Sequence, residues 1–217
     1  MQKIALIGST ELSARLIHYF SSTGFGETVG MFDDFEPVGK IKYDRPILGS
    51  MSMLPGLYRK AAFDSVAIAV GYSKRPFRKQ AYDYVKSSRI PLATFVHPSS
   101  YVEGSASVGE GSIILVQCVL DMNACLKENV FMASHGFLSH DVKIGAHCYL
   151  GPSISLAGGT QVGECCFVGI STTTIEKITL GHNVQTAGGA VVTRDVPSDC
   201  MIAGVPATIK KKLAPLY

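Results

Sequence analysis

The sequence has few charged residues and no long apolar run. Charged residues make up only 17% of its 217 residues, and the formal net charge is +3. A balance this close to neutral gives no electrostatic argument for binding nucleic acid. No apolar run reaches the roughly 18 residues that a membrane-spanning helix needs, so we expect no membrane insertion. Apolar residues, at 47%, are frequent enough to predict a folded protein with a core.

Several short motifs are missing as well. The first residues, MQKIALIGST, lack the charged segment, apolar segment and cleavage site of a signal peptide. The six cysteines show no CxxC spacing, so we expect a cytoplasmic protein whose reduced thiols fill space in the core. A GxGxxG fingerprint is absent too, which argues against an NAD-dependent enzyme. No pattern of carboxylates or thiolates predicts a metal site.

Residues 1 to about 95 alternate between strand-like and helix-like segments. We expect strands at 3–8, 28–34 and 65–71 and helices at 11–20 and 75–88, with a weak helix around 50–60 that follows the segment PILGS (46–50). In the first helix, Leu12, Leu16, Ile17 and Phe20 fall on one face. Strands that alternate with helices predict a small parallel sheet with right-handed crossovers, which is an α/β, Rossmann-like fold class.

From about residue 100 a six-residue repeat replaces this alternation. Every sixth residue from Val102 to Val192 is aliphatic or methionine at fourteen of sixteen positions, and the exceptions are Thr174 and Thr186. Neither a helix nor an ordinary strand has a period of six, so the repeat predicts a parallel β-helix. Each unit would form one short strand and a turn, and three units would close one triangular coil. Stacked coils would bury a continuous aliphatic column and pair their backbones at about 4.8 Å.

Residues 102–196 resemble the hexapeptide-repeat acyltransferases, whose coils wind left-handed, and the segment AGGAVVTRDVPSDCMIAGVPATIKK (187–211) resembles the ending of that family. The chain is similar to one branch, the nucleotide-sugar and sialic-acid acetyltransferases, through segments 31–50, 95–102 and 139–141. This resemblance implies a nucleotide-sugar-binding domain over residues 1–95. It also implies a left-handed parallel β-helix acyltransferase domain, with a C-terminal tail, over residues 96–217.

The segment SHD (139–141) contains the candidate catalytic base, His140. An imidazole, with a pKa of about 6.5, can accept the proton that an attacking amine or hydroxyl loses during acyl transfer. Asp141 could fix its tautomer. The family motif, which supports the same role, commonly has an acidic residue where this chain has Ser139. Orientation of His140 must therefore rest on Asp141 or on a group that the sequence does not reveal. His135 matches no family role, and we expect it to hydrogen-bond locally.

The resemblance also implies acetyl-CoA as co-substrate. Gly158, about one coil after His140, matches the position whose backbone N–H faces the thioester carbonyl in relatives and would act as an oxyanion donor. Ile170 and Gly188 match further cofactor positions, which we expect along the same edge. Tyr149 stands where relatives often have a second histidine. That departure, with Ala133 in place of an asparagine, leaves the acceptor and the acyl group open. The glycines could equally serve only as corner turns.

The loop after the first strand, Gly8, Ser9 and Thr10, is where a phosphate could meet the N-terminus of the helix at 11–20. Relatives usually have a G-x-x-G-H loop here. Only Gly8 of that pattern remains, because Glu11 and Leu12 replace the Gly–His pair, and a carboxylate near phosphate is unfavourable unless it points away.

Asp33 and Asp34 close the second strand, and Gly71 closes the strand at 65–71. By resemblance the aspartates would accept hydrogen bonds from the base or ribose of the nucleotide. Gly71 would let the chain pass close to the base. The alternative for the aspartates is a solvated turn.

The leading hypothesis is therefore direct transfer of an acetyl group from acetyl-CoA to the amine of a nucleotide-linked 4-amino-4,6-dideoxy sugar, for surface glycan, O-antigen or capsule synthesis. One alternative is O-acetylation of a sialic acid or related sugar, and another is a non-catalytic β-helix scaffold. The resemblance also implies a homotrimer in which each active site lies between two chains. The sugar, the nucleotide (UDP or dTDP) and the acyl group stay open.

Overall fold

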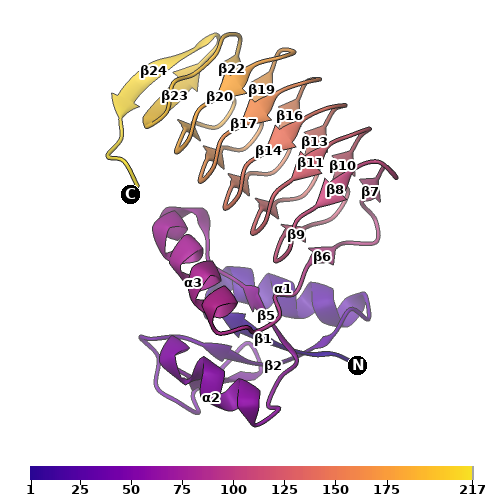
Figure 1. Cartoon of the computed structure of the whole chain (residues 1–217), viewed down its shortest axis with the longest axis vertical. Coiled ribbons are helices and arrows are strands. Elements are labelled where there is room, and N and C mark those ends of the chain that lie inside the picture. Colours follow the sequence, from indigo (N-terminus) through magenta and orange to yellow (C-terminus); the bar gives the residue numbers. More distant parts are fainter. Residues whose placement is uncertain (217) are drawn as a thin grey trace. The chain divides into compact units, whose positions relative to one another are not determined.

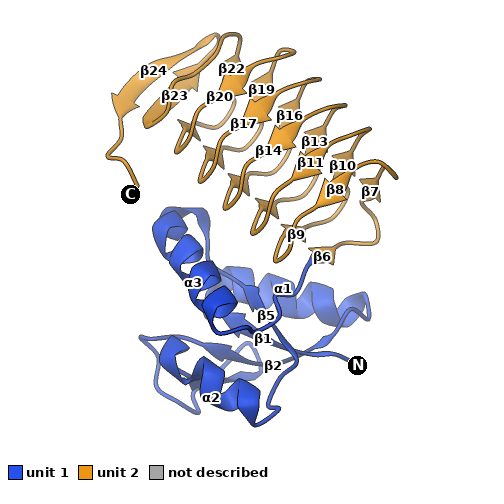
Figure 2. Cartoon of the chain, in the orientation of Figure 1, with its two compact units in different colours: residues 1–94 blue, residues 95–217 orange. Residues whose placement is uncertain are grey.

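The structure, a computed structural model, describes residues 1–216 (Figure 1). The chain divides into two compact units, unit 1 at residues 1–94 and unit 2 from residue 95 onward (Figure 2). Among the described residues, none of the helices combines the length and the apolar character needed to cross a bilayer.

Unit 1 is an α/β unit with a five-stranded sheet. Its strands are β1 (Lys3–Ile7), β2 (Glu27–Phe32), β3 (Ile41–Lys42), β4 (Arg45–Gly49) and β5 (Ser65–Ile68), and its helices are α1 (Glu11–Ser22), α2 (Leu54–Arg59) and α3 (Arg75–Ser87), with short 3-10 helices η1 (Met51–Met53) and η2 (Tyr72–Lys74). The sheet order is β3-β4-β2-β1-β5. β1 pairs in parallel with both β2 and β5. The carboxyl ends of these three strands therefore open at one edge, where ligands of open α/β sheets bind.

The buried strand β1 explains why this sheet forms. Residues 4–7 are all at most 1% exposed, as expected for a parallel strand that is covered on both faces. The sequence analysis missed β3, which pairs antiparallel with β4 through a tight turn at Tyr43 and Asp44. Both turn residues have positive φ, 50° and 58°. The usual Asn-Gly or Asp-Gly signal of such a turn is absent, because a tyrosine takes the first position.

Unit 2 is a parallel β-helix with three faces, and Figure 1 shows its short strands stacked coil upon coil. The first face holds β6 (Phe95–Val96), β9 (Ile113–Ile114), β12 (Phe131–Met132), β15 (Tyr149–Leu150), β18 (Phe167–Val168), β21 (Gln185–Thr186), β23 (Cys200–Gly204) and β24 (Ala207–Lys212). The second holds β7 (Tyr101–Val102), β10 (Val119–Leu120), β13 (Phe137–Leu138), β16 (Ser155–Leu156), β19 (Thr173–Thr174) and β22 (Val191–Val192). The third holds β8 (Ser107–Val108), β11 (Cys125–Leu126), β14 (Lys143–Ile144), β17 (Gln161–Val162) and β20 (Thr179–Leu180).

The predicted repeat occupies the second residue of each short strand. Leu138, Ile144, Leu150 and Leu156 are each at most 1% exposed and belong to one continuous core cluster. From β6 to β22, paired strands on one face are 18 residues apart, as in the pairing of Leu138 with Leu156. Burial of the aliphatic column therefore fixes the register of every coil on the next. The fold class predicted from the sequence is confirmed in both units, and β6 extends the repeat by one strand.

The two exceptions to the aliphatic repeat are satisfied polar side chains. Thr174 is only 3% exposed, and its hydroxyl lies 2.8 Å from the Thr160 hydroxyl and accepts a hydrogen bond from the Ala157 N–H. Thr186 makes the equivalent contact with Thr172, at 2.6 Å. A buried hydroxyl is tolerated when it is hydrogen-bonded, so these positions stay within the core without an aliphatic side chain.

The substitution Thr174→Val should therefore destabilise the protein, although it restores the aliphatic repeat. Valine keeps the shape of threonine but leaves the Ala157 N–H and the buried Thr160 hydroxyl without this partner, which costs about 1–3 kcal/mol. Chemical denaturation would measure the loss. Thr179→Val is the matched control, because Thr179 is exposed, and its effect should stay within about 0.5 kcal/mol. Equal stability of Thr174→Val and the wild type would contradict the role of these hydroxyls.

Candidate functional site

His140 and Asp141 lie at a corner of the β-helix between the second and third faces. We call this the His140 corner, and it comprises residues 139–142, 157–160 and 175–178. His140 Nδ1 lies 2.9 Å from Asp141 Oδ2. This contact assigns the ring proton to Nδ1 and leaves Nε2 free to accept a proton. The hydrogen bond to Asp141 raises the pKa of the imidazole and, in return, lowers the pKa of the carboxyl group. The pair thus has the geometry of a general base with an orienting carboxylate.

A third residue, Asn123, contacts this pair. Its side-chain amide donates to Asp141 Oδ1 at 3.0 Å. Asn123 was not identified from the sequence, although it precedes Asp141 by 18 residues, which is the offset between successive coils. Searching for polar residues one coil before Asp141 would have found it.

Gly158 lies directly against the imidazole. A Cβ atom built at Gly158 would lie 2.4 Å from His140 Nε2, so only glycine leaves the ring in this position. The backbone on either side is held by stacking of the coils, because the Gly159 N–H donates to the His140 carbonyl at 2.9 Å. His135, by contrast, is exposed, and its backbone N–H donates to the Val116 carbonyl at 3.0 Å.

The structure corrects one expectation about the cofactor positions. Ile170 and Gly188 lie together, since a Cβ atom at Gly188 would be 2.8 Å from Ile170 Cγ2. They do not share an edge with His140 and Gly158. They lie between the first and second faces, at a corner that we call the Gly188 corner, which comprises residues 151–154, 169–172 and 187–190. Tyr149 lies on the first face, stacked on Phe131 with ring centroids 4.6 Å apart. Within a single chain, the predicted base His140 is therefore separated from Ile170, Gly188 and Tyr149.

Unit 1 contains a cavity of about 600 Å³ at the carboxyl ends of β1, β2 and β5. Five of the predicted binding residues line it: Gly8, Thr10, Asp33, Asp34 and Gly71. The lining also includes residues that the sequence analysis did not select, among them Phe35, Met51, Lys74 and Phe77. Lys74 follows β5 closely in sequence, so its place at this edge could have been inferred from the topology, whereas the apolar side chains gave no such signal.

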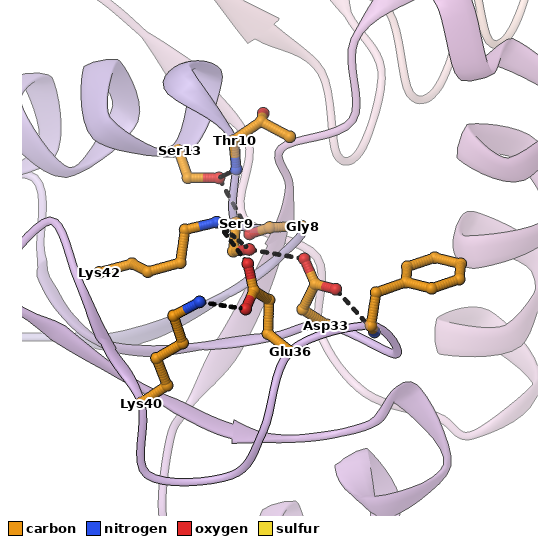
Figure 3. Close-up of polar contacts among 9 residues, drawn as sticks. Gly8, Ser9, Thr10, Ser13, Asp33, Glu36, Lys40 and Lys42 are labelled. Atoms are coloured by element: carbon orange, nitrogen blue, oxygen red, sulfur yellow. Dashed lines mark hydrogen bonds and ion pairs between the residues drawn. The ribbon is translucent and has the colours of Figure 1, made fainter.

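Gly8 is required by the local geometry at the floor of this cavity. Its φ of +102° is unfavourable for other residues, and a Cβ atom there would lie 2.8 Å from the Ala69 carbonyl oxygen. The next residue, Ser9, is only 2% exposed. Its hydroxyl donates to Asp33 Oδ2 at 2.6 Å and accepts from Lys42 Nζ at 3.0 Å (Figure 3). Ser9 therefore orients Asp33 rather than facing the cavity itself.

The two aspartates are not a merely solvated turn. Asp33 Oδ1 accepts from the Phe35 N–H at 2.9 Å, and Asp34 Oδ1 accepts from the Met51 N–H at 2.7 Å. These bonds fix both carboxylates at the cavity while leaving acceptor capacity for a ligand.

A second network holds the segment that follows the aspartates. Glu36 is bonded to Lys40 Nζ at 2.7 Å and to Lys42 Nζ at 2.9 Å (Figure 3). Hydrogen bonds from Lys40 and Lys42 lower the pKa of Glu36, and Glu36 raises the pKa of Lys42. Lys42 thereby connects the β3 hairpin to the loop after β1 through Ser9.

No family model matches the chain. A serine acetyltransferase of Synechococcus elongatus is 29% identical over 109 residues, which are 45% of this chain and 44% of that protein. A UDP-3-O-acylglucosamine N-acyltransferase of Bordetella pertussis is 26% identical over 106 residues, 47% of this chain and 29% of that protein. The chain thus spans less than half the length of these curated relatives.

Two solved structures are similar over nearly the whole chain. A variant of the GDP-perosamine N-acetyltransferase of Caulobacter crescentus, solved with CoA and GDP-perosamine, is 25% identical, covers 98% of both chains and has a TM-score of 0.87. The acetyltransferase domain of PglB from Neisseria gonorrhoeae, solved with acetyl coenzyme A, is 25% identical over 96% of this chain and 99% of that chain, with a TM-score of 0.88. The expected resemblance to hexapeptide-repeat acyltransferases, and to a branch with an N-terminal α/β unit, is confirmed.

The substitution Gly158→Ala should displace the imidazole with little loss of stability. The added methyl group meets a half-exposed side chain, which can rotate away. Gly163→Ala is the matched control, because a Cβ there would meet the backbone of Gly181 and His182 at 2.7 Å, and overpacking of this kind costs about 1–3 kcal/mol. Denaturation curves and the NMR signals of the His140 ring would separate the two effects. An unmoved ring in Gly158→Ala would contradict the contact.

Proposed function

We propose that the chain is an acetyl-CoA-dependent N-acetyltransferase that acts on the amino group of a nucleotide-linked 4-amino-4,6-dideoxy sugar. The observation that carries this proposal is the bonded pair His140–Asp141, placed against Gly158. It occurs in a chain whose structural neighbour over 98% of its length was solved with CoA and GDP-perosamine.

The proposed reaction is direct attack of the sugar amine on the thioester carbonyl carbon. As the new C–N bond forms, His140 Nε2 takes a proton from the amine, and Asp141 stabilises the resulting imidazolium. The Gly158 N–H would donate to the oxyanion of the tetrahedral intermediate. When the C–S bond breaks, the imidazolium returns its proton to the leaving thiolate, so CoA departs as the free thiol and the base is regenerated.

The nucleotide part of the substrate is assigned to the cavity of unit 1. Gly8, Ser9 and Thr10 precede the N-terminus of α1, which favours a phosphate. Asp33 and Asp34 would accept hydrogen bonds from base or ribose, and Gly71 would lie beside the base. All of these residues except Ser9 line one cavity of about 600 Å³, a volume typical of small-molecule sites, and this supports the assignment.

We also propose a homotrimer in which each site lies between two chains. Acetyl-CoA would contact His140 and Gly158 of one chain, and Ile170, Gly188 and Tyr149 of its partner. Two observations support this arrangement. The His140 corner and the Gly188 corner are separate in one chain, and the second face between them exposes large apolar side chains, including 60% of Tyr101 and 39% of Phe137. A second copy would cover such a surface.

A cytoplasmic location and a role in surface glycan synthesis, such as O-antigen, belong to the same proposal. The six free cysteines support the location, because thiols stay reduced there.

The substitution His140→Ala should lower the rate of CoA release by about 10²- to 10⁴-fold, because the base is lost. Thiol release from acetyl-CoA would be measured with GDP-, UDP- and dTDP-linked amino sugars. His18→Ala is the control: it removes an exposed imidazole on α1 that belongs to neither corner and does not line the cavity of unit 1. Equal rates in His140→Ala and the wild type would defeat the catalytic assignment. No turnover and no CoA binding by the wild type would favour the scaffold alternative.

Mixing two inactive variants should restore part of the activity if the site lies between chains. His140→Ala removes the base, and Gly188→Trp blocks the opposite corner. In mixed trimers formed from equal amounts, about a quarter of the sites would pair an intact His140 with an intact Gly188 of the next chain. A site within one chain would regain nothing. Sedimentation of the wild type as a monomer at micromolar concentration would also contradict the proposal.

A further inference from the structure

The carboxylate of Asp141 is shared between two neighbours. Oδ2 is bonded to His140 Nδ1 at 2.9 Å, and Oδ1 accepts from the Asn123 amide at 3.0 Å. The side chain of Asp141 is 55% exposed, so water competes for both oxygens. A carboxylate held by one bond alone could rotate about its side-chain torsions and break that bond. Two partners on opposite oxygens fix the plane of the carboxylate and its aim at the imidazole.

The register of the β-helix creates this contact. Asn123 and Asp141 occupy the same place in successive coils, and both have left-handed backbone, with φ of 58° and 59°. Asparagine and aspartate adopt this conformation more readily than other residues with a side chain. The preceding coil in turn holds Asn123, because the Asn123 backbone N–H donates a hydrogen bond to the Ser105 hydroxyl oxygen at 2.9 Å. Ser105, Asn123 and Asp141 thus form a ladder with a spacing of 18 residues.

At position 123, a neutral amide can donate a hydrogen bond to Asp141 without adding a charge near His140. Ser139 stands where the resemblance would have an acid, so no carboxylate directly precedes His140 in the chain. Asp121, Glu176 and Lys143 are the charged groups that act on the pair through space. A lysine or arginine in place of Asn123 would also bond Asp141, but its charge would oppose the imidazolium. The neutral amide orients the carboxylate and adds no positive charge.

We propose that Asn123 is a positioning residue of the site: its amide holds the Asp141 carboxylate in the orientation in which Asp141 bonds to His140. The Asn123 amide bonds to Asp141, and Asp141 bonds to Nδ1 of His140. This arrangement leaves Nε2 facing the position of Gly158. Its importance for catalysis depends on the proposed function, but its effect on His140 does not.

The test uses substitutions that keep the left-handed backbone. Asn123→Gly removes the amide without strain at φ 58°. Asn123→Asp keeps the shape but replaces the donor by a carboxylate that repels Asp141. Asn183→Gly is the control for loss of an amide at another corner, because Asn183 has a φ of 54° and donates to the Asp199 carboxylate at 2.8 Å and to the Ala214 carbonyl at 3.1 Å. Asn183 is buried, so the stability of this variant is measured as well. Asp141→Gly, alone and combined with Asn123→Gly, completes a double-mutant cycle.

Two readouts are measured on the full chain. The first is the pH dependence of kcat and KM for CoA release, and the second is the NMR titration of the His140 ring, which needs no substrate. In Asn123→Gly we expect kcat to fall about fivefold, as for loss of one modest hydrogen bond, with KM for the sugar nucleotide unchanged. The midpoint of the His140 titration should move down, because Asp141 spends less time beside Nδ1. Asn123→Asp should lose at least as much kcat, and Asn183→Gly should change neither readout.

In the Asp141→Gly background, Asn123→Gly should have no further effect, since the residue through which it acts is gone. A His140 midpoint that stays or rises in Asn123→Gly would overturn the proposal, and so would an Asn123→Asp variant with the kcat of the wild type. If the wild type releases no CoA with any sugar nucleotide, the proposed function fails, while the NMR titration still decides the role of Asn123.

Discussion

The burial of one aliphatic side chain at every sixth residue is the constraint on which unit 2 depends. It sets the length of each strand and turn, and it stacks residue i on residue i+18, as in the pairing of Phe137 with Ser155. Once this register is fixed, two side chains can be brought together by sequence spacing alone. The contacts between Asn123 and Asp141, and between His140 and Gly158, both use the 18-residue offset. The polar contacts at the surface of the β-helix are thus positioned by an aliphatic core that takes no part in them.

Much of unit 2 could be predicted from the sequence for this reason. The period of six is a strong signal, and even its exceptions, Thr174 and Thr186, are explained by polar partners within the same interior. The expectation that Ile170 and Gly188 share an edge with His140 was wrong, and arithmetic on the repeat would have corrected it. They follow His140 by 30 and 48 residues, which are five and eight units, and neither number is a multiple of three. A three-sided coil therefore places both on another corner, whereas Gly158, three units on, returns to the corner of His140.

Unit 1 was less predictable, because its contacts depend on packing between segments rather than on a repeat. The parallel strands and their shared edge followed from the alternation of strands and helices, and this placed Gly8, Asp33 and Gly71 at one cavity. The bond between Ser9 and Lys42 did not follow. It requires the β3 hairpin, which was hidden by an unusual turn at Tyr43 and Asp44. A side chain brought in by such a hairpin has no fixed sequence offset from its partner.

In a single chain, the His140–Asp141 pair is open to water. The side chains of His140 and Asp141 are 51% and 55% exposed, so water screens the attraction between them and competes for their hydrogen bonds. Electrostatic interactions strengthen when bound molecules or a second chain exclude water from a site. While the pair is exposed to water, two hydrogen bonds from neighbouring coils keep it aligned. The Gly159 N–H donates to the His140 carbonyl, and the Asn123 amide donates to the Asp141 carboxylate. The stacked coils therefore keep His140 oriented toward Asp141, while the strength of the attraction between them depends on whether a bound molecule or a second chain excludes water.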